Sequence, residues 1–242
     1  MKELTWQDVL QAQQQDFIQR LKYSLNKPEY DNLTLSCFDY HPVYCEKSYP
    51  SERIIISRFL EQEIDKFCCE LLKKYNQGFT VDDYMNHKIG KIGEEAVNIY
   101  LDKLITGVDY KIHSGGDGGI DFMLKNNKNI GIQVKTKSLN RITSINPIIE
   151  NHLDYINMDL YETQIDRFDE IKWTIKQDEI KKNKVLVCVL LMNHIVVDNI
   201  QGSYDCIITG FKPTAEIKDS GDLKMQDLLY SGGMRPFLES FS

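Results

Sequence analysis

Residues Gly118 to Lys137 read GGIDFMLKNNKNIGIQVKTK and predict two β-strands joined by a tight turn. Apolar and polar side chains alternate over 120–125 and again over 130–137, which is typical of strands with one buried face. The polar, Asn-rich residues 126–129 form the predicted turn. The alternation puts Asp121 on the polar face of the first strand, and Gln133 and Lys135 on that of the second. We therefore expect these three side chains to converge at one margin of a sheet.

The three predicted neighbours suit the hydrolysis of a phosphodiester. A carboxylate oxygen of Asp121 and the amide oxygen of Gln133 are the ligands that a hard divalent cation prefers, so Mg²⁺ is the expected metal and Mn²⁺ its substitute. The ammonium group of Lys135 lies on the same predicted face. It could orient or deprotonate the attacking water, or stabilise the charge that builds on the phosphate.

Asp121 followed by Gln133-Val134-Lys135 resembles the D…(D/E/Q)-x-K signature of the PD-(D/E)XK nuclease superfamily, in the Gln-containing variant of its Mrr-like restriction branch. Members of that family also take an acidic residue from an upstream helix, and residues 92–101 resemble that helix. Both Glu94 and Glu95 are candidates. At about 100° per residue, Glu94 falls at the edge of the apolar stripe and Glu95 points away from it. The resemblance therefore assigns Glu94 to the metal site or to its outer shell.

The resemblance implies an α/β fold with a restriction-endonuclease-like αβββαβ core, a mixed central sheet and a helical N-terminal extension. The expected core covers residues 82–211 and includes a strand over Val108 to His113. We accordingly divide the chain into a helical N-terminal region, 1–78, and a nuclease domain, 79–242.

Two departures from the family pattern affect the expected metal site. Ile120 stands where the family has Pro, which is a common variation. Gln133 replaces an acid and removes one negative charge, so cation affinity should be weaker. The glycines at 115, 116, 118 and 119 do not form a nucleotide-binding loop, because no Gly-Lys-Ser or Gly-Lys-Thr follows and the next element is a predicted strand. They predict a close backbone turn before Asp121, with Asp117 as a minor alternative ligand.

The net charge of the 242 residues is −7, which argues against nonspecific binding of DNA over a large surface. Charge can be segregated, however, and basic residues surround the predicted site. Lys125, Lys137 and Arg141 are the predicted contacts to nucleic acid. A second group of lysines, between residues 172 and 184, is predicted to be a solvated helix face.

Six cysteines without a C-x-x-C pair fit a reduced cytoplasm. The longest apolar run, 185–192, predicts a strand and is too short to cross a membrane. The first residues have neither a basic start nor an apolar signal core, so we expect a cytoplasmic protein without membrane contact.

Several other elements follow from local signals. Ser51 after Pro50 predicts the start of a long helix that ends near Tyr75, and Thr80 with Asp83 predicts a capping box for the next helix. The ranges 185–192 and 204–211 are predicted core strands. Trp173 is predicted to be a core residue.

These observations predict a Mg²⁺-dependent endonuclease acting on DNA in restriction, phage defence or a mobile element. Cutting both strands needs two sites, so a homodimer or a higher homo-oligomer is expected. Two alternatives remain open at this point: an RNA-cleaving nuclease, and a catalytically silent, nuclease-derived module that binds nucleic acid or has a structural role. Gln133 motivates the second alternative.

Overall fold

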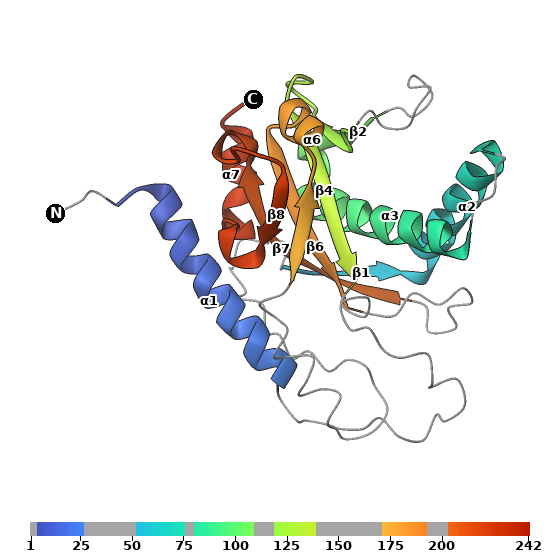
Figure 1. Cartoon of the computed structure of the whole chain (residues 1–242), viewed down its shortest axis with the longest axis horizontal. Helices are drawn as coiled ribbons and strands as arrows, with labels where there is room; N and C mark the ends of the chain where they lie inside the picture. The colour runs from blue at the N-terminus through green and yellow to red at the C-terminus, as the bar shows by residue number, and fades with distance from the viewer. Residues whose placement is uncertain (1–3, 27–51, 76–79, 109–118, 139–170, 193–202) are drawn as a thin grey trace.

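The computed structural model describes residues 4–26, 52–75, 80–108, 119–138, 171–192 and 203–242, and shows an α/β protein (Figure 1). The α-helices in these ranges are α1 (Trp6–Asn26), α2 (Arg58–Tyr75), α3 (Val81–Leu101), α6 (Gln177–Lys182) and α7 (Met234–Glu239). The strands are β1 (Arg53–Ser57), β2 (Ile105–Gly107), β3 (Phe122–Leu124), β4 (Gly131–Ser138), β5 (Lys172–Ile175), β6 (Val185–Leu191), β7 (Ser203–Pro213) and β8 (Gly221–Lys224). Short 3-10 turns are η1 (Asp102–Leu104), η3 (Thr214–Glu216), η4 (Met225–Asp227) and η5 (Ser231–Gly233).

Six strands form one mixed, curled sheet in the order β1-β7-β6-β4-β3-β2, and β5 pairs with β8 in a separate antiparallel ribbon. Within the large sheet, β4 and β6 are parallel, and every other neighbouring pair is antiparallel. The parallel pair lies at the centre. A parallel pair needs a crossover connection, and the described part of that connection contains β5 and α6.

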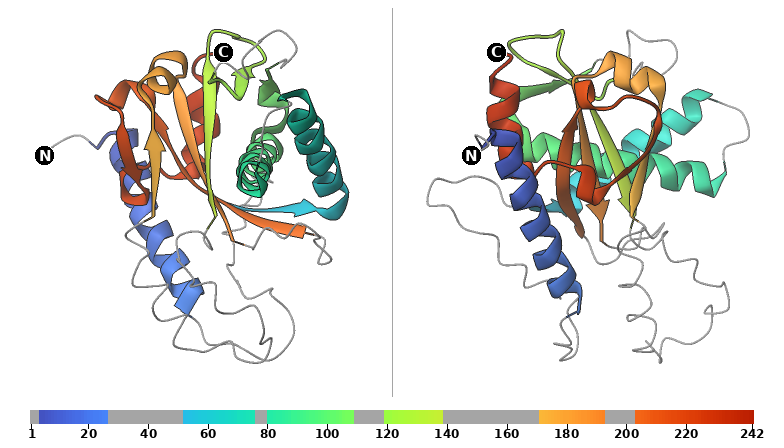
Figure 2. Two further views of the ribbon diagram at one scale, coloured as in Figure 1. Left: turned by 45° about the vertical axis from the view of Figure 1, so that its right-hand side comes forward. Right: turned by 60° about the vertical axis from the view of Figure 1, so that its left-hand side comes forward.

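The two faces of the sheet pack against different elements. Val134 and its register partner Val187 belong to the apolar core that includes residues of α2 and α3, such as Cys68 and Ile92. The opposite face carries Leu186, Cys188 and Leu190, which pack with residues of α1, β5 and β8. Figure 2 shows α2 and α3 on one side of the sheet, and α1 with β8 on the other. Gln133, Lys135 and Lys137 of β4, the register partners of these three residues of β6, therefore lie on the second face.

Helix α3 begins with the predicted capping box, which the structure confirms. The Thr80 hydroxyl accepts from the Asp83 N–H at 3.2 Å, and the Asp83 carboxylate accepts from the Thr80 N–H at 2.9 Å. The helix approaches β4 very closely at Gly93, where a Cβ atom would lie 1.8 Å from Thr136 Oγ1. Glycine at this position lets the helix backbone rest directly on the strand.

The prediction of one helix from Ser51 to Tyr75 is wrong at its N-terminal end. Residues 53–57 form β1, which pairs with β7 at one edge of the sheet, and the helix begins only at Arg58. Three consecutive isoleucines, 54–56, favour a strand because β-branched side chains lose rotamer freedom in a helix. Ile54 and Ile56 are buried while Ile55 is exposed, which is the period of a strand with one buried face.

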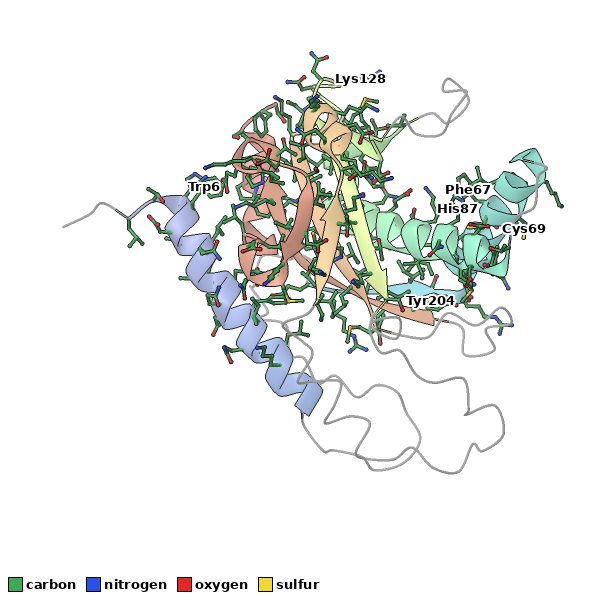
Figure 3. The ribbon with its side chains drawn as sticks, in the orientation of Figure 1. Trp6, Phe67, Cys69, His87, Lys128 and Tyr204 are labelled. Atoms are coloured by element: carbon green, nitrogen blue, oxygen red, sulfur yellow. The ribbon has the colours of Figure 1, made fainter. Side chains whose placement is uncertain are left out.

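Lys88 of α3 is completely buried between α2 and β7. Its Nζ lies 2.8 Å from Asp65 Oδ1 and 3.1 Å from Glu61 Oε1, and sits 5.4 Å from the centre of the Tyr204 ring. The attraction of these groups outweighs desolvation and raises the pKa of Lys88 above its ordinary value. In Figure 3, Tyr204 lies toward one end of the sheet and the labelled Lys128 lies beyond the other end.

The strands flanking the predicted turn are confirmed as β3 and β4, and Trp173 is buried in the core as expected. Strand β2 is Ile105–Gly107 and ends before Val108, the first residue of the strand expected over Val108 to His113. The other residues of that expected strand lie outside the described ranges. The boundary between 78 and 79 stays a prediction. In the structure, β1 of the first region is a strand of the same sheet as β7 of the second.

Candidate functional site

Asp121 lies immediately before β3 and is held by the neighbouring strand. Its backbone N–H donates to the Ile132 carbonyl at 3.1 Å. Its side-chain Oδ2 accepts from the Val134 N–H at 2.6 Å and from Gln133 Nε2 at 2.8 Å. With 3% of its surface exposed, the carboxylate is fixed in a buried position by strand pairing.

Gln133 is buried beside Asp121, as the strand alternation predicts. Its Oε1 has no hydrogen-bond partner among the described residues, although a buried polar atom is normally paired. Rotating the amide about its last side-chain bond would exchange Oε1 and Nε2, since that torsion is roughly two-fold. The oxygen would then face Asp121 at the distance that Nε2 now occupies.

That distance agrees with a shared cation. Mg²⁺ binds oxygen at 2.0–2.1 Å in octahedral geometry, so neighbouring ligand oxygens lie about 3 Å apart. The 2.8 Å separation between Asp121 Oδ2 and the Gln133 amide is close to this value. Histidine, cysteine and acidic residues do not form a group of three suited to a metal anywhere in the described ranges. The fit therefore depends on the amide oxygen of Gln133 together with the carboxylate of Asp121.

Lys135 projects from the same face of β4 and contacts an acidic residue that sequence reasoning missed. Its Nζ lies 2.5 Å from Glu179 Oε1, on helix α6. The other carboxylate oxygen, Glu179 Oε2, accepts from the Lys176 N–H at 2.9 Å at the start of that helix. The sequence signal for Glu179 was local: an acidic residue at the third position of a short helix. Nothing in the sequence linked it to Lys135, which is 44 residues away.

The end of α6 is anchored to the strands that carry Asp121 and Gln133. Asn183 Nδ2 donates to the Gly119 carbonyl at 2.7 Å. A Cβ atom at Gly131 would lie 2.9 Å from Asn183 Oδ1 and 2.8 Å from the Lys182 carbonyl, so this close approach requires glycine. Helix α6 is therefore seated over the first residues of β4, on the face of Gln133 and Lys135.

Glu94 has a different environment. Its carboxylate lies 2.7 Å from Lys91 Nζ on the same helix. Helix α3 packs on the face of the sheet that carries Val134 and Thr136, whereas Lys135 points to the face covered by α6 and β5. The structure brings Asp121 and Gln133 into contact and places Lys135 beside Gln133 along β4. The role of Glu94 as a metal ligand stays a prediction.

A hollow of about 260 Å³ adjoins Lys135 at the end of β4. It lies between β4, β5 and the first half of α3, and three lysines line it: Lys135, Lys137 and Lys172. Lys137 Nζ donates to the Lys172 carbonyl at 3.1 Å, and Lys172 Nζ lies 2.6 Å from Asp222 Oδ2. Lys172 was predicted on a solvated helix face. That is a correction, because Lys172 belongs to β5, where pairing with β8 fixes the strand.

The other predicted nucleic-acid contacts are distributed differently. Lys125 is exposed and follows β3 directly. Figure 3 shows the nearby Lys128 at the tip of the turn between β3 and β4. Arg141 and the alternative ligand Asp117 lie outside the described residues.

Comparison with known proteins adds no family to these observations: no family model, no curated protein and no solved structure matches the chain. A bilayer-spanning helix needs a long apolar run, and none of the helices within the described ranges has one. The functional argument therefore rests on the geometry around Asp121, Gln133 and Lys135.

Proposed function

We propose that the protein is a Mg²⁺-dependent endonuclease that hydrolyses phosphodiester bonds in DNA. The observation that carries the proposal is the contact between Asp121 and Gln133, with a buried amide oxygen lacking a hydrogen-bond partner among the described residues and with Lys135 on the same strand face. These are the groups that a metal-dependent phosphodiesterase uses, and each has a distinct task.

Asp121 and Gln133 would hold the cation through one carboxylate oxygen and the amide oxygen. The bound Mg²⁺ would polarise the scissile phosphate and lower the pKa of a coordinated water. Lys135 would donate a hydrogen bond to the attacking water or to a phosphate oxygen, which stabilises the negative charge of the transition state. The water would lose a proton to solvent as its oxygen forms the new bond to phosphorus. The bond between phosphorus and the sugar oxygen would break, and that oxygen would take a proton from solvent.

The order and direction of the elements support a restriction-endonuclease-like core. Helix α3 is followed by β2, β3 and β4 as an antiparallel meander, and after a crossover β6 runs parallel to β4. Helix α6 lies in the described part of that crossover and would be the second helix of an αβββαβ arrangement. The predicted signature needs its acidic residue and its lysine on neighbouring strands, and this agrees with Asp121 immediately before β3 and Lys135 within β4.

The lysine-lined hollow supports a polyanionic substrate. Lys137 and Lys172 lie next to Lys135, where they could contact the phosphates that flank the scissile bond. Phosphate contacts of this kind hold a strand in place without reading its sequence. DNA and RNA both offer such phosphates, so the sugar preference has to be measured by comparing cleavage of the two.

A silent binding module is the second candidate, and a specific observation favours it. Asp121 Oδ2 already accepts two hydrogen bonds, and Gln133 brings no negative charge to the cation. A site of this kind could persist as a structural remnant in a protein that only binds nucleic acid.

The test is cleavage of supercoiled plasmid, single-stranded DNA and RNA in the presence of Mg²⁺, Mn²⁺ or EDTA. Wild-type protein is compared with Asp121→Asn and Lys135→Ala, and Lys66→Ala serves as a matched lysine control on the remote helix α2. We expect metal-dependent cutting that both site variants lose and the control retains. No cutting of any substrate, or cutting that survives both site substitutions, would overturn the proposal.

The expected homodimer is tested in the same preparation by light scattering. A dimer that converts plasmid directly to linear DNA agrees with two cooperating sites. A monomer that only nicks would contradict the proposed assembly. A role in restriction or phage defence predicts fewer plaques on cells that express the wild-type protein than on cells that express Asp121→Asn.

A further inference from the structure

We infer that Glu179 supplies the carboxylate that Gln133 lacks, and that it is a third protein ligand of the divalent cation. This inference rests on the proposed function, because it concerns the same metal site. It assigns a metal-binding role to a residue that lies far from the D…Q-x-K signature in sequence and reaches the site only through helix α6.

Glu179 is placed beside the predicted site by its contact with β4. Its carboxylate is buried and contacts Lys135 on the polar face of β4. Lys135 and Gln133 are two residues apart on the strand, so their Cα atoms are separated by about 7 Å and their side chains point the same way. Glu179 thus lies over the face of β4 that carries Gln133, and the amide of Gln133 contacts Asp121.

Helix α6 is tied by hydrogen bonds to the segment that precedes Asp121. Asn183, one turn after Glu179, donates to the carbonyl of Glu179 at 2.9 Å and to that of Gly119 at 2.7 Å. Gly119 is two residues before Asp121. The same side chain therefore ties the acidic residue of α6 to the segment that presents Asp121, so the two carboxylates are held in one unit.

The net charge of the predicted site also favours a role for Glu179. Asp121, Gln133 and Lys135 together carry no net charge, which gives a divalent cation little electrostatic attraction. Glu179 adds one negative charge at this face. Its Oε2 is anchored by the Lys176 N–H, while Oε1 contacts Lys135. If the cation takes Oε1, Lys135 loses that partner and its ammonium becomes available to the attacking water.

The opposing interpretation is an ion pair that only stabilises the fold. Mn²⁺ binding by Glu179→Gln separates the two, because only a ligand role makes the affinity depend on this charge. The amide keeps one acceptor oxygen, for the Lys176 N–H, and turns its NH2 group toward Lys135. Asp178→Asn is the matched control: Asp178 is on the same helix, its side chain is 60% exposed, and it pairs loosely with Lys182 at 3.7 Å.

The measurement is Mn²⁺ affinity of the full chain without substrate, by calorimetry and by the paramagnetic resonance signal of free Mn²⁺. We expect Glu179→Gln to weaken binding by about tenfold or more, and Asp178→Asn to leave it unchanged. The melting temperature of Glu179→Gln checks that the variant is folded at the temperature of the titration. Adding Gln133→Glu to Glu179→Gln should restore affinity, since the charge returns to the same site.

The outcomes separate this inference from the proposed function. Wild-type protein that binds no Mn²⁺ and cuts nothing contradicts the metal site as a whole. Wild-type protein that binds Mn²⁺ with an affinity equal to that of Glu179→Gln overturns only the role of Glu179. Failure of Gln133→Glu to restore affinity in a folded double variant would also overturn it.

Discussion

The side-chain Oδ2 of Asp121 lies 2.6 Å from the backbone nitrogen of Val134, across the pair formed by β3 and β4. The carboxylate therefore takes the place of a ladder partner at the point where strand pairing ends. This contact helps to hold Asp121 in position and satisfies a buried N–H group. Asp121 therefore has a structural role in addition to its proposed role in metal binding.

Two substitutions at Asp121 should separate its structural role from its proposed role in metal binding. Asp121→Asn keeps an acceptor for Val134, so the free energy of unfolding should change little, whereas cation affinity falls with the lost charge. Asp121→Ala leaves the buried N–H unpaired and should cost about 1–3 kcal/mol of stability as well. Denaturant unfolding and Mn²⁺ titration of both variants check this. Equal stability of the two variants would show that the contact with Val134 contributes nothing.

The lysine-lined hollow predicts a salt-dependent contact with nucleic acid. Lys137→Ala and Lys172→Ala should each weaken binding of a single-stranded oligonucleotide and reduce the slope of log affinity against log salt by about one. Lys125→Ala tests the predicted contact after β3 in the same way. Fluorescence anisotropy at several salt concentrations is the measurement, with Lys66→Ala as the control. An unchanged slope for both hollow variants would exclude this hollow from the binding surface.

The contact between α3 and β4 predicts opposite effects of alanine at two glycines of one helix. At Gly93 the new methyl group would overlap Thr136 and should destabilise the protein by about 1–3 kcal/mol. At Gly90 nothing lies within 4 Å of the new Cβ, so alanine should stabilise the helix by about 0.5–1 kcal/mol. Thermal unfolding measures both. Adding Thr136→Ala to Gly93→Ala should recover part of the loss, and no recovery would locate the strain elsewhere.

The adjacent cysteines of α2 should differ in reactivity. Burial raises the pKa of Cys68 to about 11, while Cys69 is exposed. At pH 8 the folded protein should be alkylated at Cys69 and not at Cys68, as peptide mass spectrometry can show. Because the folded pKa of Cys68 is raised, its stabilising contribution is complete below the ordinary thiol pKa and is lost as the pH rises through about 11. Equal labelling of the two residues at pH 8 would contradict the buried position of Cys68.

Local sequence determined a large part of the candidate site. Alternation along two short strands placed Asp121 and Gln133 on facing positions, since a strand sends successive side chains to opposite faces. The capping box at Thr80 and Asp83 was equally readable, because its hydrogen bonds join residues three apart. These features depend on backbone geometry over a few residues, so the sequence alone predicts them.

Tertiary structure decided the rest. The segment of Ile54 to Ile56 became a strand because β7 supplies its hydrogen-bond partners, although helical periodicity continues into the next residues. Glu179 contacts Lys135, and Lys172 lines the hollow, only because β5 and α6 pack against the sheet far from their position in the sequence. No local pattern encodes such meetings. They follow from packing between distant segments, where burial on a shared face brings residues into contact regardless of their separation along the chain.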